Sequence, residues 1–335
     1  MDKDWLPQPG TRLGATFYVR RSQPWLSHYF GIDRLDATLA PGIGGVVLWG
    51  GRIPAKTARA IAKLRGLPSW YLEDGFLRSV GLGKENTLPI SIQIDDLGMP
   101  VDASRPSRLE VLIAASAGMN FGGLGSEIRA ALIREKLSKY NNLPHRSPKL
   151  EATTRRRVLL VDQVYGDVSV PMAGGSAASF ERMLQDAVAS DMQCVVRTHP
   201  DVMAGFRKGY LTEQARRTPG VVVTAEPVSV ASMLEVIDEV WTVSSQMGLD
   251  ALIRGTPVRC YAAPSYAGWG LTDDHFEGKS RVVARRRRAR PSIDQLVAAA
   301  FSLYPCYRDT NGWREIDVFT AIETLAAERR QMNLD

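Results

Sequence analysis

The chain has 335 residues, 44% of them hydrophobic and 23% charged, and its formal net charge at pH 7 is +6. Such a chain is globular and exceeds the roughly 250–300 residues beyond which one hydrophobic core rarely grows, so we expect two domains with a cleft between them. No stretch approaches the roughly 18 consecutive apolar residues of a membrane-spanning helix, and the first residues lack the apolar segment of a signal peptide. These features argue against a secreted or membrane-spanning protein.

The cysteines argue against disulfides and against a metal site. Cys194, Cys260 and Cys306 are far apart and form no CxxC or Cys–His pattern. Isolated cysteines of this kind, two of them in apolar runs, are typical of reduced core residues, which predicts a cytoplasmic protein. Because no His/Cys cluster has the spacing of metal ligands, we predict no essential metal.

Eight arginines lie in two clusters, and their combined charge of +8 exceeds the net charge of +6. Three occupy residues 155–157, where a solvated linker edge is the ordinary interpretation. The other five are Arg285, Arg286, Arg287, Arg288 and Arg290. They are compatible with a solvated loop, with anionic lipid at the inner membrane or an anionic acceptor, and with nucleic acid. We favour lipid or acceptor contact, because no nucleic-acid motif or set of stacking aromatic residues accompanies the run.

The first half of the chain alternates strand and helix. Residues 44–50 are an apolar strand, residues 55–65 a helix and residues 69–72 a second strand. This alternation predicts a parallel sheet whose functional groups follow the carboxyl ends of the strands. Glu73, Asp74, Arg78 and Ser79 therefore face a crevice, either as a structural ion pair or as catalytic and sugar-binding groups.

The first domain continues with a strand and hairpin at residues 88–101 and helices at residues 108–115 and 126–140. Residues 142–154 contain two prolines and mixed charge, which is typical of a linker.

A second strand–helix series begins with the continuous apolar run at residues 157–162, typical of a buried parallel strand. Asp162 and Asp167 lie in the segment that follows it. A crossover helix is predicted at residues 180–189, and the next strand, residues 194–197, ends at His199 and Pro200. Each of these strand ends belongs at the same edge of a sheet, so we expect their polar residues to meet.

The stretch at residues 241–274 combines a strand, a turn into a helix and an aromatic loop. Ser244, Ser245 and Gln246 open the helix, and two hydroxyls with several unpaired backbone N–H groups predict a phosphate site. An ordinary N-cap serine is the alternative. After a short strand at residues 258–261, the glycine-rich loop carries Tyr266 and Trp269, whose flat faces suit contact with a ring. Helices at residues 292–302 and 313–329 end the chain.

Three motifs in this order resemble one bacterial family. PSYAGWGLTDD at residues 264–274, LEDGFLRSVGLG at residues 72–83 and RTHPD at residues 197–201 are similar to the capsule polysaccharide β-Kdo glycosyltransferases (KpsC/LipB type), which build a Kdo linker on a lipid. Many members carry two modules, and this chain is long enough for one. The resemblance implies an α/β GT-B fold with two Rossmann-like domains, residues 1–150 on the acceptor side and 151–310 for the CMP-sugar, with residues 311–335 crossing back to the first.

The same resemblance implies a donor and its contacts. In sialyltransferase-like enzymes, HP and SS motifs bind CMP, so the residues assigned to the nucleotide are His199, Pro200, Ser244, Ser245 and Gln246. Arg78 or Arg197 would hold the carboxylate of Kdo. Asp74, Tyr266 and Trp269 complete the expected sugar and acceptor contacts. The implied partners are CMP-Kdo and a Kdo-terminated glycolipid, with no separate cofactor, at a cytoplasmic position peripheral to the inner membrane.

CMP-Kdo carries a β-phosphate and the family makes β-linkages, so the resemblance implies retention of configuration. Retention suggests a carboxylate nucleophile and a second group that activates the acceptor. We assign Asp167 as the nucleophile and keep Asp162 as the second candidate. The structural alternative for Asp167 is a helix N-cap or an Asx turn. Glu73 is the acid/base, and His199 assists the departing phosphate. The competing hypotheses are a transferase for another CMP-sugar and a non-catalytic module that recognises the Kdo linker.

Overall fold

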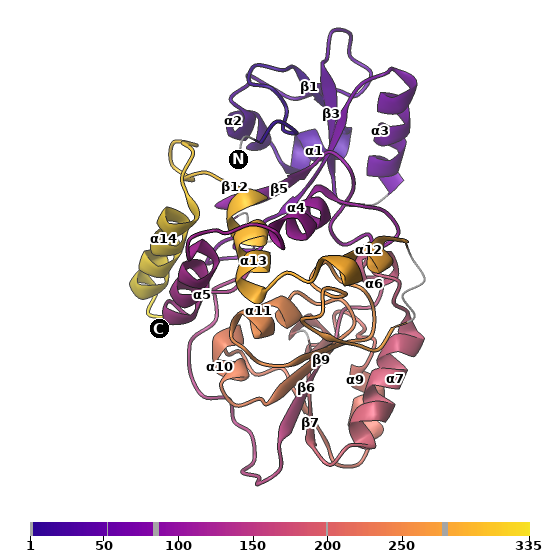
Figure 1. Ribbon diagram of the computed structural model, residues 1–335, viewed down its shortest axis with the longest axis vertical. Coiled ribbons are helices and arrows are strands. Elements are labelled where there is room, and N and C mark those ends of the chain that lie inside the picture. The colour runs from indigo at the N-terminus through magenta and orange to yellow at the C-terminus, as the bar shows by residue number, and fades with distance from the viewer. Residues whose placement is uncertain (1–2, 52, 83–86, 199, 277–280) are drawn as a thin grey trace.

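The computed structural model describes residues 3–51, 53–82, 87–198, 200–276 and 281–335, and it folds into two lobes (Figure 1). Each lobe is built on a six-stranded sheet. The first lobe takes the N-terminal half of the chain, the second takes most of the rest, and the C-terminal segment returns to the first. The two-domain α/β architecture predicted from the alternating pattern is confirmed.

The first sheet has the strand order β12-β5-β4-β3-β1-β2. Its strands are β1 (Leu13–Ala15), β2 (Asp36–Ala37), β3 (Gly45–Trp49), β4 (Ser69–Asp74), β5 (Ser91–Asp95) and β12 (Cys306–Tyr307). Strands β1 to β4 are parallel, whereas β5 runs antiparallel to β4 and β12 antiparallel to β5. The sheet was expected to be parallel, and it is instead mixed, because β5 and β12 form an antiparallel edge.

The second sheet is parallel throughout, with the order β11-β10-β9-β6-β7-β8. Its strands are β6 (Arg157–Val161), β7 (Gln193–Arg197), β8 (Val221–Thr224), β9 (Glu239–Thr242), β10 (Val258–Cys260) and β11 (Asp273–Asp274). The chain runs outward from β6 to β8 and then resumes on the other side of β6 at β9. This reversal is the switch point at which open α/β sheets bind ligands, beyond the carboxyl ends of the two central strands.

Helices cover both sheets and fill the space between the lobes. They are α1 (Phe17–Ser22), α2 (Leu26–Phe30), α3 (Ile53–Leu64), α4 (Arg108–Ser116), α5 (Leu124–Arg134), α6 (Ser169–Met172), α7 (Ala177–Val188), α8 (Pro200–Met203), α9 (Thr212–Arg217), α10 (Val230–Leu234), α11 (Met247–Ile253), α12 (Arg281–Ala289), α13 (Ile293–Ala298), the π-helix Ala299–Leu303 and α14 (Val318–Gln331). No helix in the described part of the chain combines the length and apolarity needed to span a membrane.

The chain returns to the first lobe earlier than the predicted residue 311. α13 already packs against α4 and α5, β12 joins the first sheet, and α14 then lies beside α5 (Figure 1). Hydrophobic packing explains this early return. Leu296, Val297 and Phe301 are buried in one hydrophobic cluster with residues of α4, α5, β9 and α11. A single core thus continues from lobe to lobe at this junction.

Candidate active site

A cavity of about 500 Å³ lies between the lobes, at the carboxyl ends of β4, β6 and β9. First-lobe residues that line it are Glu73, Phe76, Gln93, Met99, Pro100, Val101, Lys139 and Tyr140, and second-lobe residues are Asp162, Gln163, Val164, Asp167, Val168, Ser169, Ala173, Ser244, Ser245, Gln246, Pro264, Ser265 and Tyr266. The structure thereby brings six of the predicted site residues to one place: Glu73, Asp167, Ser244, Ser245, Gln246 and Tyr266.

Gln163, which the sequence did not single out as a site residue, links the two strand ends at the switch point. It follows β6, and its Oε1 accepts a hydrogen bond of 3.0 Å from the backbone N–H of Ser244, which follows β9. Its Nε2 lies 3.0 Å from Ser244 Oγ, 3.2 Å from Ser169 Oγ and 3.3 Å from Asp167 Oδ2. One amide therefore orients two hydroxyls and a carboxylate at the cavity wall.

Asp167 combines a local turn with exposure to the cavity. Its Oδ1 accepts the backbone N–H of Ser169 at 2.9 Å, which is the Asx-type turn considered as the structural alternative. Its Oδ2 faces Gln163. The local hydrogen bond fixes the carboxylate without using both of its oxygens.

Asp162, the reserve nucleophile, is anchored far more heavily. This buried carboxylate accepts backbone N–H bonds from Gln163 at 2.8 Å, Leu211 at 2.9 Å and Thr212 at 3.1 Å, so it holds the start of α9. A group that satisfies three buried donors is costly to redirect. Of the two aspartates, Asp167 is the better placed for chemistry.

Glu73 ends β4 on the opposite wall, where its environment favours the neutral acid. Burial raises the pKa of its carboxyl group, and the negative charges of Asp74 and Asp167 raise it further, while Lys139 opposes them. Burial lowers the pKa of Lys139, but neighbouring Tyr140, Asp74 and Glu73 outweigh it, so that pKa is raised overall and the side chain stays charged. Lys139 is the cation among the described residues that line the cavity, and sequence reasoning missed it.

The two arginines expected to bind a carboxylate are used elsewhere. Arg78 Nε lies 2.9 Å from Asp74 Oδ1, with both side chains mostly buried, which is the structural ion pair. Arg197 donates to the carbonyl of Val228 at 2.8 Å, and burial lowers its pKa to about 10. Neither arginine nor Asp74 is among the described residues that line the cavity, and their sugar contact stays a prediction.

The turn at residues 244–248 does not present the row of unpaired N–H groups that the sequence predicted. The N–H of Ser245 donates to Thr242 Oγ1 at 3.1 Å, that of Met247 to Ser245 Oγ at 3.3 Å and that of Gly248 to the carbonyl of Ser245 at 3.2 Å. Neighbouring hydroxyl and carbonyl oxygens therefore accept the hydrogen bonds of these three N–H groups. The side chains of the two serines still line the cavity, so any anion contact here belongs to them.

Gln246 spans the lobes rather than pointing at solvent. Its Nε2 donates to the carbonyl of Phe76 at 2.9 Å. At this cavity, a hydrogen bond therefore joins the second lobe to the first.

The two aromatic rings of the glycine-rich loop, Tyr266 and Trp269, lie in different places. Tyr266 lines the cavity and donates its hydroxyl to the carbonyl of Ser245. Trp269 is 1% exposed and donates its Nε1–H to the carbonyl of Ser265 at 2.8 Å. The structure places Trp269 in the core, where it shapes the loop, and its sugar contact stays a prediction.

The nucleotide prediction for the HP motif is not decided. His199 lies outside the described residues, and of Pro200 only the backbone is described, at the start of α8. Their roles stay predictions.

The second arginine run forms α12 and is only partly solvated. Arg285 and Arg286 approach Glu110 of α4 at 2.8 and 3.6 Å, and the buried Arg286 also donates to the carbonyl of Pro264 at 2.8 Å. These two side chains join α12 to α4, and the buried Arg286 is not accessible to a lipid surface. Lipid or acceptor contact stays a prediction for the exposed Arg287, Arg288 and Arg290.

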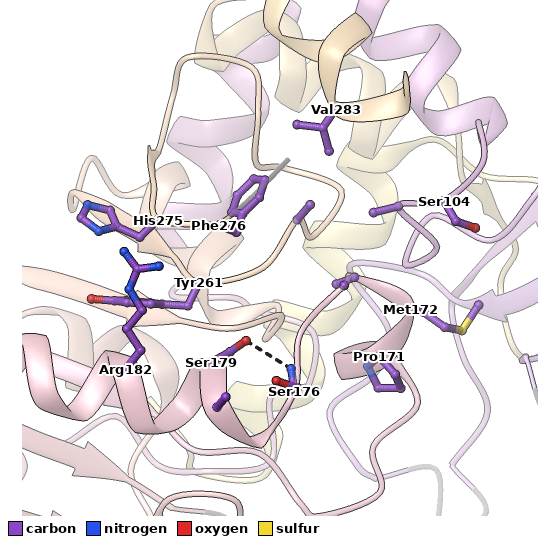
Figure 2. A pocket seen from close by; sticks show the side chains of 15 residues that line it. Ser104, Pro171, Met172, Ser176, Ser179, Arg182, Tyr261, His275, Phe276 and Val283 are labelled. Atoms are coloured by element: carbon purple, nitrogen blue, oxygen red, sulfur yellow. Dashed lines mark hydrogen bonds between the residues drawn. The ribbon is translucent and has the colours of Figure 1, made fainter. Parts of the chain in front are cut away.

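A second pocket, of about 400 Å³, shares the lining residue Ala173 with the cavity between the lobes. Ser176 and Ser179 at the start of α7 line one side, and the side chains of Arg182 and His275 lie on another (Figure 2). Of the described residues around it, none belongs to the predicted site. The predicted site residues that the structure brings together therefore line the cavity between the lobes and not this second pocket.

The sequence matches the family model described as "Capsule polysaccharide biosynthesis protein" over residues 44–141 and 124–307. The chain belongs to this family. The capsule polysaccharide modification protein LipA of Neisseria meningitidis serogroup B is 40% identical over 293 residues, which are 85% of this chain and 42% of LipA. The lipopolysaccharide-processing protein LpsZ of Rhizobium meliloti is 36% identical over 84% of this chain and 64% of its own length. The chain thus spans about two fifths of LipA and less than two thirds of LpsZ.

Among solved structures, this capsule family member is similar over nearly its full length to "Thermosulfurimonas dismutans KpsC, beta Kdo 2,4 transferase". The TM-score is 0.84 and the identity 33%, over 96% of this chain and 99% of that one. The "beta Kdo 2,7 transferase" of the same organism has a TM-score of 0.73 at 22% identity, which bears on the fold alone. The GT-B fold predicted from the motifs is confirmed.

Proposed function

We propose that this capsule family protein is a retaining β-Kdo glycosyltransferase that moves Kdo from CMP-Kdo to a Kdo-terminated acceptor. The observation that carries the proposal is the cavity at the switch point, where Glu73, Asp167 and Lys139 meet the Ser244–Ser245 turn. The 33% identity to a β-Kdo transferase over 96% of the chain supports the same activity.

CMP-Kdo places a phosphate and a carboxylate on one anomeric carbon, and the cavity offers a partner for each. The hydroxyls of Ser244 and Ser245 suit the phosphate oxygens. Lys139 suits the carboxylate, in the place first given to Arg78 or Arg197, because a charged lysine stabilises an anion most strongly in a partly buried site. His199 remains the proposed hydrogen-bond donor to the departing phosphate.

The proposed reaction has two displacements. An oxygen of Asp167 attacks the anomeric carbon, the bond to the phosphate breaks with CMP as leaving group, and a glycosyl ester remains. Glu73 then takes the proton of an acceptor hydroxyl, whose oxygen attacks the same carbon and releases Asp167. Two inversions give net retention, and the raised pKa of Glu73 makes its carboxylate a stronger base than that of an ordinary glutamate.

The direct test supplies CMP-Kdo, generated in place, with a synthetic lipid-like acceptor that ends in β-Kdo, and analyses the product by mass spectrometry and NMR. We expect one added Kdo residue in β-linkage. Asp167→Ala should give no product while still binding CMP, and Asp238→Ala, far from the cavity at the start of β9, should behave like the wild type. A wild-type protein that binds CMP tightly but transfers nothing, or an active Asp167→Ala variant, contradicts the proposal.

A further inference from the structure

A groove of about 380 Å³ lies on the first lobe beside α3, outside the catalytic cavity. Lys56, Arg59 and Lys63 of α3 line it, together with Tyr71, Met99 and Arg105. In Figure 1, α3 flanks β3 on the outer side of the first sheet. Nothing in the proposed chemistry uses these side chains.

The α3 helix separates its apolar and basic sides. Ala55, Ala58 and Ala62 are buried against the sheet. Lys56, Arg59 and Lys63 follow at intervals of three and four residues, which places them in a row on one face about 10 Å long at 1.5 Å per residue.

Within the described residues, no ion pair joins these three cations to a carboxylate, and Asp102, which also lines the groove, is paired with Arg105 at 2.9 Å. Elsewhere on the surface arginines are commonly paired, as in Arg12–Asp36 and Arg330–Glu135 at 2.8 and 3.0 Å. Arg59 instead lies over the ring of Tyr71, 5.5 Å from its centroid. Three like charges held along a concave surface raise the local concentration of anions.

The groove borders the catalytic cavity. Met99 lines both, and Met172 at the end of α6 lines the groove. Gly51 lets the two methionines pack closely at this boundary, because a Cβ there would lie 2.9 Å from Met172 Sδ and 3.0 Å from Met99 Sδ. The groove and the cavity are therefore neighbours that share the Met99 side chain as a wall.

We propose that the groove, through Lys56, Arg59 and Lys63, binds the carboxylates of an acidic saccharide that forms the part of the acceptor beyond its reacting end. The inference rests on the proposed function and adds a binding site to it. A neutral glycan gives the three cations no counter-charge, whereas a Kdo-rich chain carries one carboxylate per residue. A concave strip next to the cavity also fits a saccharide chain better than a flat lipid surface.

The test compares acceptors of different charge on the full chain. Wild type, a Lys56→Ala/Arg59→Ala/Lys63→Ala variant and an Arg207→Ala/Arg216→Ala/Arg217→Ala control receive CMP-Kdo with synthetic acceptors that carry one or three Kdo residues. The control removes the same charge from exposed positions of the second lobe. For the α3 variant we expect KM for the three-Kdo acceptor to rise at least tenfold, with kcat and the KM for CMP-Kdo within twofold of wild type and a smaller effect on the one-Kdo acceptor.

Calorimetric binding of a free Kdo trisaccharide, measured without donor, separates this inference from the proposed function. Binding that is lost in the α3 variant and kept in the control supports the groove even where no transfer is seen. Equal binding and equal KM in all three proteins overturn it. Loss of binding to phosphatidylglycerol vesicles with unchanged KM overturns it too, in favour of a lipid surface.

Discussion

Glu73 is the residue whose environment makes the clearest kinetic prediction. Burial raises the pKa of its carboxyl group and Lys139 lowers it. A base must be deprotonated, so the acid limb of the kcat/KM profile should lie above the ordinary range of glutamate. Glu73→Gln should lower kcat by roughly 10²–10⁴-fold. Lys139→Met should move the acid limb to higher pH, and an unmoved limb would exclude Glu73 as the titrating base.

Gln163 is predicted to act by positioning. Its amide accepts the N–H of Ser244 and donates towards Asp167. Gln163→Leu leaves these partly buried groups unpaired at about 1–3 kcal/mol, which is roughly 5–150-fold in CMP affinity or kcat/KM. Calorimetry with CMP measures the loss, and Gln214→Leu on exposed α9 is the control. Wild-type affinity and rate in Gln163→Leu would show that the hydrogen bonds do not matter.

Asp250 on α11 predicts a pH dependence of stability. Burial raises its pKa to about 6, although Arg254, Lys139 and Arg197 act against the shift. The folded protein therefore holds this proton over a pH range in which the unfolded chain has released it, so the contribution of Asp250 to stability falls as pH rises from about 4 to about 6. The free energy of unfolding of wild type minus that of Asp250→Asn should drop by roughly 2–3 kcal/mol across this range in urea titrations. A pH-independent difference would contradict the shift.

At the scale of elements, the contact between α11 and the aromatic loop depends on a missing side chain. A Cβ at Gly248 would lie 2.3 Å from Tyr266 Oη, in the ring that lines the cavity. Gly248→Ala should displace Tyr266, destabilise the protein by about 1–3 kcal/mol and lower transfer activity. Gly118→Ala is the matched control, since the nearest atom to its Cβ is 3.9 Å away. Equal melting temperatures for the two variants would mean that the loop adjusts freely.

Helices and strands were predictable from the sequence where a short local pattern of apolar residues is enough to specify them. Strands β6 and β7 are apolar runs in the sequence and central strands in the fold, because a parallel strand covered on both faces must be apolar throughout. α12 was predicted as a charged surface run. Its arginines become partly internal because Glu110, about 175 positions earlier in the chain, lies opposite them.

At the scale of the whole molecule, Glu110 and Arg286 form a buried link between the lobes. Burial raises the pKa of Glu110, although both arginines lower it. Glu110→Gln leaves Arg286 with carbonyl acceptors alone and should cost about 2–3 kcal/mol of stability, because an uncompensated charge stays buried. Glu213→Gln removes the exposed pair with Arg216 and should cost less than about 1 kcal/mol. Similar costs for the two variants in chemical denaturation would contradict the role of burial.

Sequence patterns alone predicted the two α/β domains, the strand ends that carry the site and six of the residues around its cavity, including Glu73, Asp167 and Ser244. Those features depend on local apolar patterns and on the rule that parallel strands end at one edge of a sheet. The family motifs added the GT-B fold and the capsule family.

Which side chains remain free to bind a substrate became apparent only from the folded structure. It paired Arg78 with Asp74, buried Trp269, satisfied the N–H groups of the serine turn and placed Lys139 and Gln163 at the cavity. Each of these outcomes depends on how a charge or a hydrogen-bonding group is partnered and buried in the folded chain, often by residues far away in sequence. A polar side chain binds whichever partner burial leaves within reach, and the order of residues alone does not specify that partner.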